Sequence, residues 1–272
     1  MRILVVNPNT TASMTDKIGS AARAVAAFGT EIIAVNPDFG PPSIEGYFDE
    51  VFAVPGLIGE MAKAPEMDAY VIACFDDTGL DAARAFVEAP VVGIGEAAFH
   101  LATLVAGRFS VVTTLALSIP AIEHNLVRYG LRSRCAKVRA SEVPVLDLEI
   151  PGSGARQRVS DEVASSLRED GAEAIVLGCA GMADLAAELS RQHDAPVIDG
   201  VAAAVKLCES AVALGLRTSK RGGYAALPFS AATNRSLNLP CGNENNARAR
   251  RGVLVVVPAW LSSAAHPAHR RR

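Results

Sequence analysis

Short runs of apolar residues alternate along this chain with alanine-rich segments whose apolar positions recur at helical spacing. The apolar runs are mostly rich in valine and isoleucine: ILVV, EIIAV, AYVIAC, PVVGIG, FSVVTT, AIVLGC and APVID. Such continuous runs are typical of strands that are covered on both faces of a parallel sheet. Helical spacing occurs in seven segments, Met14 to Ala27, Leu80 to Val87, Glu96 to Val105, Ile119 to Tyr129, Val159 to Arg168, Ala183 to Arg191 and Val201 to Leu214. This alternation predicts a doubly wound α/β architecture, in which ligands bind beyond the carboxyl ends of the strands.

Two stretches of the chain resemble each other. Residues 68–98 and 171–204 each run through an apolar stretch to a cysteine, then through a helix-like segment to Ala-Pro and a second apolar stretch. The cysteines, Cys74 and Cys179, are 105 residues apart, and the matching prolines are 106 apart. The segments that begin at positions 2 and 108 match with the same offset of 106. Self-similarity at a fixed spacing indicates a duplicated structural unit.

The duplication predicts two pseudo-symmetric doubly wound parallel-sheet subdomains. We expect residues 1–97 together with 207–236 to form the N-terminal α/β subdomain, and residues 98–206 to form the second. The strand and helix rhythm stops near Ser230, and residues 237–272 form an atypical basic tail that is rich in arginine. We expect this tail to be disordered and dispensable, although the apolar run at 253–261 is a signal against that interpretation.

The composition limits which kinds of binding partner and which cellular compartment we expect. The 50% hydrophobic content is ordinary for a globular protein, and a formal charge of −3 gives no basic field for nucleic acid or an anionic membrane. No run reaches the roughly 18 apolar residues of a spanning helix, and no leader pattern precedes the first strand. Five cysteines without short paired spacings fit reduced thiols better than a disulfide framework. We therefore expect a cytoplasmic protein that binds neither nucleic acid nor membrane.

The two matching cysteines each follow a strand and precede a helix-like segment. A thiol in that position faces unpaired N–H groups and the positive end of a helix dipole, which predicts a lowered pKa. The same N–H groups can receive an oxyanion that develops on a substrate carbonyl. A single cysteine is more often a buried apolar residue, but equivalent positions for Cys74 and Cys179 favour a catalytic pair. Cys135 and Cys208 have no such counterpart, and we assign them to packing or to the surface.

The sequence gives less support to other kinds of active or binding site. His100, His124 and His193 belong to no nucleophile motif, which disfavours a cysteine protease. The first strand is followed by Asn-Pro-Asn-Thr-Thr rather than a glycine-rich turn, and no phosphate-binding loop occurs. No Cys-x-x-Cys or His-Glu-x-x-His cluster indicates a zinc site. We expect no metal and no cofactor.

Several motifs together resemble the hydantoin racemase branch of the aspartate/glutamate racemase superfamily. They are RILVVNPNTT, GPPSIEG, VIACFDDTGLDAAR, VVTTLALSIPAIE, VLGCAGMADL and APVIDGVAAAVKL. The similarity extends from Arg2 to about Tyr224, and the paired cysteine motifs are fairly specific. The resemblance implies an active site between two α/β subdomains and cofactor-independent racemisation in a homo-oligomer.

The resemblance also assigns roles to individual residues. Cys74 and Cys179 match the two catalytic cysteines. The positions that cradle the substrate correspond to Asn9, Phe75, Asp76, Thr113, Thr114, Ala180 and Gly181. The implied mechanism is a two-base proton transfer at C5 of a hydantoin ring, in which one cysteine removes a proton as thiolate and the other returns one as neutral thiol.

The substrate remains open at this stage. Allantoin is itself a substituted hydantoin, so an allantoin racemase is the nearest alternative to a racemase of other 5-substituted hydantoins. Amino-acid racemases and maleate isomerase-like enzymes are further alternatives, and non-enzymatic binding of a small ligand is the alternative from another class. No cationic residue falls within the cysteine segments 74–79 and 179–184 or beside Thr113 and Thr114, which favours a neutral ring over an amino acid. The loop from Asn36 to Tyr47 forms either a wall around the ring substituent or a simple connector.

Overall fold

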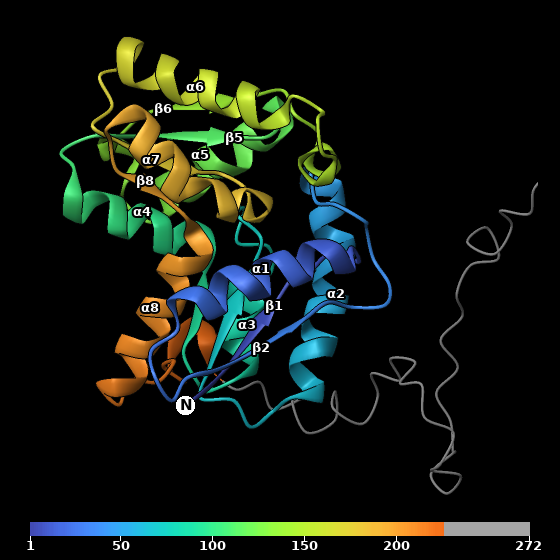
Figure 1. Cartoon of the computed structure of the whole chain (residues 1–272). Helices are drawn as coiled ribbons and strands as arrows, with labels where there is room; N and C mark the ends of the chain where they lie inside the picture. The colour runs from blue at the N-terminus through green and yellow to red at the C-terminus, as the bar shows by residue number, and fades with distance from the viewer. Residues whose placement is uncertain (226–272) are drawn as a thin grey trace, which may run out of the picture. The chain divides into compact units, whose positions relative to one another are not determined.

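Two parallel four-stranded sheets form the framework of the computed structural model, which describes residues 1–225. The first sheet has the order β2-β1-β3-β4 and consists of β1 (Arg2–Val6), β2 (Glu31–Val35), β3 (Ala69–Ile72) and β4 (Val91–Gly93). The second has the order β6-β5-β7-β8 and consists of β5 (Phe109–Thr113), β6 (Cys135–Ala140), β7 (Ala174–Leu177) and β8 (Val197–Ile198). The two orders are the same when each sheet is numbered from its own first strand. The predicted duplication and the α/β fold are therefore confirmed (Figure 1).

Eight α-helices connect and cover these strands within the described residues. They are α1 (Ala12–Val25), α2 (Tyr47–Lys63), α3 (Leu80–Phe86), α4 (Ile94–Val105), α5 (Ile119–Arg128), α6 (Ala155–Glu169), α7 (Ala186–His193) and α8 (Gly200–Ala213). Short 3-10 helices lie at η1 (Ala116–Ser118), η2 (Arg132–Arg134), η3 (Val145–Glu149), η4 (Ala180–Leu185) and η5 (Gly222–Tyr224). The seven predicted helices are present with shifted ends, whereas α2 and β6 were not predicted.

Alternate residues of each buried strand pack into different cores. In β1, Ile3 and Val5 belong to a core that also contains residues of α1, α4 and α8 and reaches strands β5 and β7. Leu4 and Val6 belong to the core on the opposite face, under α2 and α3. The outer face of the second sheet packs with α6 and α7 in a third core. Both faces of both sheets are therefore covered, as the continuous apolar runs predicted.

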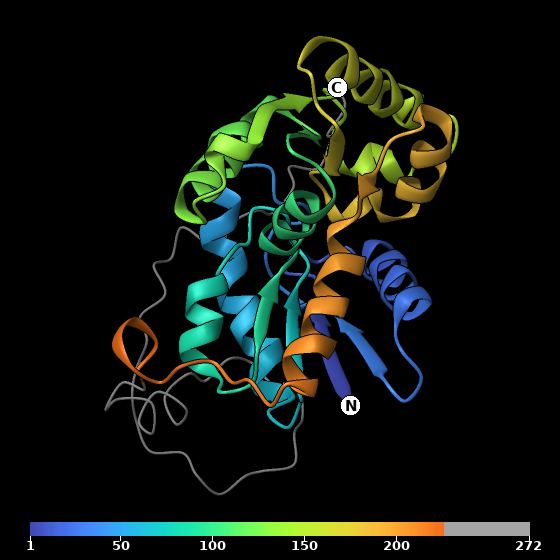
Figure 2. The same ribbon diagram turned by 90° about the vertical axis from the view of Figure 1, so that its left-hand side faces the viewer.

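Helix α8 follows the second sheet in the chain but packs against β3 and β4 of the first (Figure 2). It also packs along α4, so these two helices join the two halves of the fold. The division into residues 1–97 with 207–236 and residues 98–206 remains a proposal. Positions 226–236, and the whole basic tail at 237–272, lie outside the described residues. No helix within residues 1–225 is long and apolar enough to cross a membrane.

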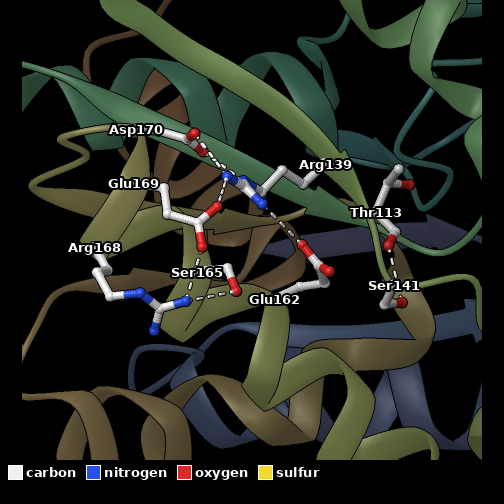
Figure 3. Close-up of polar contacts among 8 residues, drawn as sticks. All are labelled: Thr113, Arg139, Ser141, Glu162, Ser165, Arg168, Glu169 and Asp170. Carbon is white, nitrogen blue, oxygen red and sulfur yellow. Dashed lines mark hydrogen bonds and ion pairs between the residues drawn. The ribbon is translucent and has the colours of Figure 1, made fainter.

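An ion-pair cluster fixes the edge strand β6 to α6 (Figure 3). The Arg139 guanidinium donates to both Asp170 carboxylate oxygens, at 2.5 and 2.8 Å, and to Glu169 at 2.8 Å. Glu162 lies 3.4 Å away in the same cluster. Only 12% of the Arg139 side chain and 9% of the Asp170 side chain are exposed, so solvent screens this pair little. These bonds hold the pKa of Asp170 below its usual range.

We expect Arg139→Met to destabilise the protein without changing its catalytic residues. The methionine keeps most of the apolar stem but leaves the buried Asp170 carboxylate without its bidentate partner. The free energy of unfolding should fall by about 2 to 3 kcal/mol, measured by urea denaturation. Arg168→Met is the matched control, because its side chain is 67% exposed and should change stability very little. An equal loss in both variants would contradict this role for the cluster.

Candidate functional site

The carboxyl ends of β1, β3, β5 and β7 meet at a cavity that residues of both halves of the chain line. Its walls consist of Asn7, Asn9, Met14, Ile44, Ala73, Cys74, Phe75, Asp76, Thr114, Ser118, Val145, Gly178, Cys179 and Ala180. Cys74 follows β3 in the first sheet, and Cys179 follows β7, the corresponding strand of the second sheet. The duplicated fold therefore brings its two equivalent cysteines to one cavity.

The Cys74 thiol lies in a tight loop rather than in the first turn of a helix, since α3 begins only at Leu80. The Thr78 hydroxyl lies 3.3 Å from Cys74 Sγ and donates to it. Burial and the nearby Asp76 carboxyl raise the pKa of Cys74 well above its usual value, although the bonds from Thr78 and the Asp76 backbone N–H act in the opposite direction. The neutral thiol is thus the favoured form.

The Cys179 thiol has a closely similar setting. It precedes the 3-10 helix η4, and the Gly181 backbone N–H donates to its sulfur. Burial nevertheless raises the pKa of Cys179 to about 12. The sequence-based expectation that both thiols have lowered pKa values is therefore wrong. Neither thiol faces the first turn of an α-helix, and removal from water outweighs the N–H donors that are present.

Residues of α4 and of the end of α5 hold the Cys74 loop in place. Asn125 of α5 donates through Nδ2 to the Asp76 carbonyl oxygen at 2.8 Å. The Asp77 carboxylate accepts from the Tyr129 hydroxyl at 2.8 Å and from the backbone N–H groups of Gly95 and Glu96 at 3.0 and 2.8 Å. Asp77 adopts a left-handed conformation with φ of 52°, which aspartate tolerates better than most residues. Four hydrogen bonds therefore anchor the loop to α4 and to the end of α5.

Close packing extends to the neighbouring backbone and to Phe75. A Cβ added at Gly93 would overlap the Asp77 carboxylate, so this position requires glycine. The Phe75 ring lies edge-on to Phe99 of α4, with centroids 5.4 Å apart, and Phe99 stacks on Phe109 at the start of β5. Phe75 therefore anchors the loop in the shared core while it lines the cavity.

A buried polar network shapes the end of β1. Asn7 donates through Nδ2 to Asn9 Oδ1 at 2.9 Å and to Thr15 Oγ1 at 3.0 Å. The Thr15 hydroxyl in turn donates to Asn36 Oδ1 at 2.8 Å. These bonds fix the direction of the Asn9 side chain at the cavity wall and connect it to the segment after β2.

Two contacts join the two halves of the chain near the cavity. The Glu45 carboxylate accepts from the Val145 backbone N–H at 2.9 Å, and Ile44 and Val145 both line the cavity. Lys17 of α1 forms an ion pair with Glu149 at 2.7 Å. The loop before α2 is therefore a wall of the cavity rather than a simple connector.

The cavity contains five of the seven residues that the resemblance assigned to substrate contact, namely Asn9, Phe75, Asp76, Thr114 and Ala180. Thr113 and Gly181 are not among its lining residues. The Thr113 hydroxyl donates to the Gly178 carbonyl oxygen at 3.0 Å, and Gly181 contributes its N–H to Cys179. Both therefore position the Cys179 segment in this structure.

Seven lining residues were not predicted from the sequence: Asn7, Met14, Ile44, Ala73, Ser118, Val145 and Gly178. Asn7 and Gly178 have a signal in the sequence, because Asn7 directly follows the run ILVV and Gly178 lies near the end of the run AIVLGC. Met14 lies near the start of α1 and Ser118 directly before α5, whereas Ile44 lies in the loop before α2 and Val145 begins the 3-10 helix η3. Neither group shows a periodic pattern that distinguishes a cavity wall from the core.

The lining of the cavity contains few charged side chains. None of the lining residues is cationic, and Asp76 is its acidic residue. No three His, Cys, Asp or Glu side chains within residues 1–225 come together in a way that could hold a metal ion. That the chemistry needs no cofactor remains a prediction.

Comparison with known proteins identifies similar racemases. The family model described as Asp/Glu/Hydantoin racemase matches residues 3–208. A hydantoin racemase of Rhizobium meliloti is 48% identical over 227 residues, which cover 83% of this chain and 94% of that protein. The structure of an allantoin racemase from Klebsiella pneumoniae is 51% identical and superimposes with a TM-score of 0.82, covering 84% of this chain and 94% of that chain. For an allantoin racemase from Pseudomonas fluorescens the identity is 44%, the TM-score is 0.81, and the coverage is 84% of this chain and 97% of that one.

Proposed function

Because the chain belongs to the Asp/Glu/Hydantoin racemase family and is an isomerase of the racemase type, we propose that it racemises 5-substituted hydantoins by proton transfer between Cys74 and Cys179. The observation that supports this most directly is the position of both thiols in one cavity, at equivalent places in a duplicated fold. Similar proteins that are named hydantoin racemase and allantoin racemase support the ring substrate.

The proposed reaction balances one proton removed against one returned. The thiolate of one cysteine takes the proton from C5, and the electron pair of the broken C–H bond delocalises onto the adjacent ring carbonyl. The neutral thiol of the other cysteine then delivers its proton to the opposite face of C5. The first cysteine ends as thiol and the second as thiolate, so the reverse reaction uses the same groups with exchanged roles.

The oxygen of the ring carbonyl needs hydrogen-bond donors while it carries negative charge. We propose that the Thr114 hydroxyl and backbone N–H groups of the two cysteine loops provide them. Asn9, Phe75 and Ala180 contribute to holding the ring, and Thr113 and Gly181 hold the Cys179 segment. A cavity without cationic side chains suits a neutral ring better than the free carboxylate of an amino acid.

Single enantiomers of 5-substituted hydantoins and of allantoin test this function. We expect optical rotation to decay to zero in the presence of the protein, with no net loss of substrate. Activity should survive chelator treatment and dialysis but not thiol alkylation. Loss of activity on chelation with recovery on adding metal would refute the cofactor-independent mechanism.

The pH dependence should reflect the raised pKa values of the thiols. Burial raises the pKa of Cys179 to about 12 and holds that of Cys74 well above its usual value, so few molecules contain a thiolate at neutral pH. Below the pKa the thiolate fraction increases with pH, and kcat/KM should therefore rise by about tenfold per pH unit between roughly pH 6 and 8. Initial racemisation rates across that range check this expectation. A rate that is independent of pH would exclude a thiolate formed from a neutral thiol with a raised pKa.

We also propose that the protein works as a cytoplasmic homo-oligomer. The cysteines among residues 1–225 are free, which suits a reducing compartment. Near its start, α2 exposes Tyr47, Phe48, Val51 and Phe52, which lie on an apolar face suited to contact with a second copy. Light scattering coupled to gel filtration determines the number of subunits.

A further inference from the structure

A second cavity of about 340 Å³ adjoins the cysteine cavity at Asp76, and its volume is within the range of small-molecule sites. Its acidic and basic lining residues are Glu50, Asp76, Asp77, Asp81, His124 and Arg128. Asp76 lines both this cavity and the one that contains the two cysteines. Asp76 therefore stands at the boundary between them, and its charge acts on Cys74 on one side and on Glu50 on the other.

Most charged groups of the second cavity already have partners. Asp77 accepts three hydrogen bonds from Tyr129 and the start of α4, and Asp81 pairs with Arg128. His124 lies on α5 and lines the same cavity. The acids that remain are Asp76 and Glu50.

Asp76 and Glu50 lack hydrogen-bond donors within residues 1–225. Asp76 is only 8% exposed, and its carboxyl group has no side-chain partner in this part of the chain, although its backbone is held by Asn125. Glu50 Oε1 is buried and likewise has no partner there. Burial, followed by repulsion from Glu50, raises the pKa of Asp76 to about 8. Buried acceptors without donors are costly, and a ligand that supplies N–H groups removes that cost.

We propose that this second cavity receives the substituent on C5 of the ring, and that Asp76 and Glu50 select substituents that contain N–H donors. This inference rests on the proposed hydantoin racemase function. Asp76 lines the cavity that contains Cys74 and Cys179 as well as the larger one, so on this proposal the substituent extends past Asp76 into the larger space. Two kinds of substituent provide the required chemistry: a neutral ureido group, as in allantoin, and an aminoalkyl group with a terminal ammonium.

Four substrates distinguish the ureido group from the aminoalkyl group. They are allantoin, 5-(4-aminobutyl)hydantoin, 5-isobutylhydantoin with an apolar group, and 5-methylhydantoin as a short reference. We expect kcat/KM of the wild type for at least one N–H substrate to exceed that for the isobutyl compound by about tenfold or more, because an apolar group leaves buried acceptors unpaired. Asp76→Asn and Glu50→Gln should each reduce this ratio at least about threefold. Glu50→Gln should affect the ammonium substrate more than the ureido substrate if charge is the main factor.

Two further variants separate this effect from general damage. Ala82→Leu adds bulk at an exposed helical position that lines the second cavity, and it should lower the ratio of allantoin to 5-methylhydantoin racemisation. Asp16→Asn removes one acidic side chain at an exposed position of α1 and should leave every ratio unchanged. Equal or faster racemisation of the isobutyl compound, or ratios that Asp76→Asn and Glu50→Gln do not change, would overturn this inference alone. Absence of racemisation with all four hydantoins would overturn the proposed function and this inference with it.

Discussion

Cys74→Ser and Cys179→Ser are each expected to reduce racemisation by about 10³-fold or more, because a buried serine hydroxyl cannot replace a thiolate as base. Serine occupies nearly the same volume, and neither sulfur belongs to a disulfide, so the fold should be retained. Chiral chromatography of the product and circular dichroism of each variant measure the two effects. Cys208→Ser, which alters a buried thiol outside the cavity, is the matched control.

Each of these variants keeps one base, and that gives a second readout. In D₂O the remaining cysteine should exchange the C5 proton of the one enantiomer that presents it, without inverting that carbon. The two variants should act on opposite enantiomers, since the two thiols belong to opposite halves of the fold. Near-normal racemisation by either serine variant would disprove the two-base mechanism.

Asp77→Ala should have the largest effect among residues that do not line the cysteine cavity. It removes three hydrogen bonds and places alanine at a φ of 52°. Lost hydrogen bonds and strain together should reduce the free energy of unfolding by about 3 kcal/mol. For a chain of this size, that corresponds to a fall in Tm of roughly 6 to 12 °C. Racemisation should also fall, because the Cys74 loop loses its anchor, and thermal unfolding and kcat measure both.

Two milder variants distinguish the contributions. Asp77→Asn keeps an acceptor and tolerates the left-handed conformation, so its loss of stability should be smaller. Tyr129→Phe removes a single hydroxyl donor and should cost about 1 kcal/mol. If Asp77→Asn and Asp77→Ala are equally unstable, neither the backbone conformation nor the remaining acceptor matters at this position.

The fold was largely predictable because buried parallel strands leave a strong signal. Continuous runs such as ILVV and AIVLGC identified β1 and β7, and the spacing of Cys74 and Cys179 revealed the duplication. The missing elements have physical reasons. Helix α2 contains Pro55 in its interior and exposes aromatic side chains near its start, so its apolar positions do not form one clean stripe. Strand β6 is an edge strand with Lys137 and Arg139 among its residues.

The sequence predicted which residues line the cavity better than it predicted the pKa values of the two thiols. The cysteine loops and Asn9 follow strands directly, and the position of the cavity follows from parallel topology. The raised thiol pKa values depend on how completely the surrounding residues exclude water, which no local pattern in the sequence reports. Ile44 and Val145 likewise reach the cavity only through tertiary contact between distant segments.

The most direct measurement of the central claim follows the label that each enantiomer acquires at early times in D₂O. One pure enantiomer of a racemised hydantoin is incubated with the wild-type protein, and both enantiomers are separated and analysed by mass spectrometry before equilibrium. Two cysteines on opposite faces of C5 predict deuterium in the newly formed enantiomer and protium in the recovered substrate. Equal deuterium content in both enantiomers from the first time point would show that one base serves both faces, and would contradict the account.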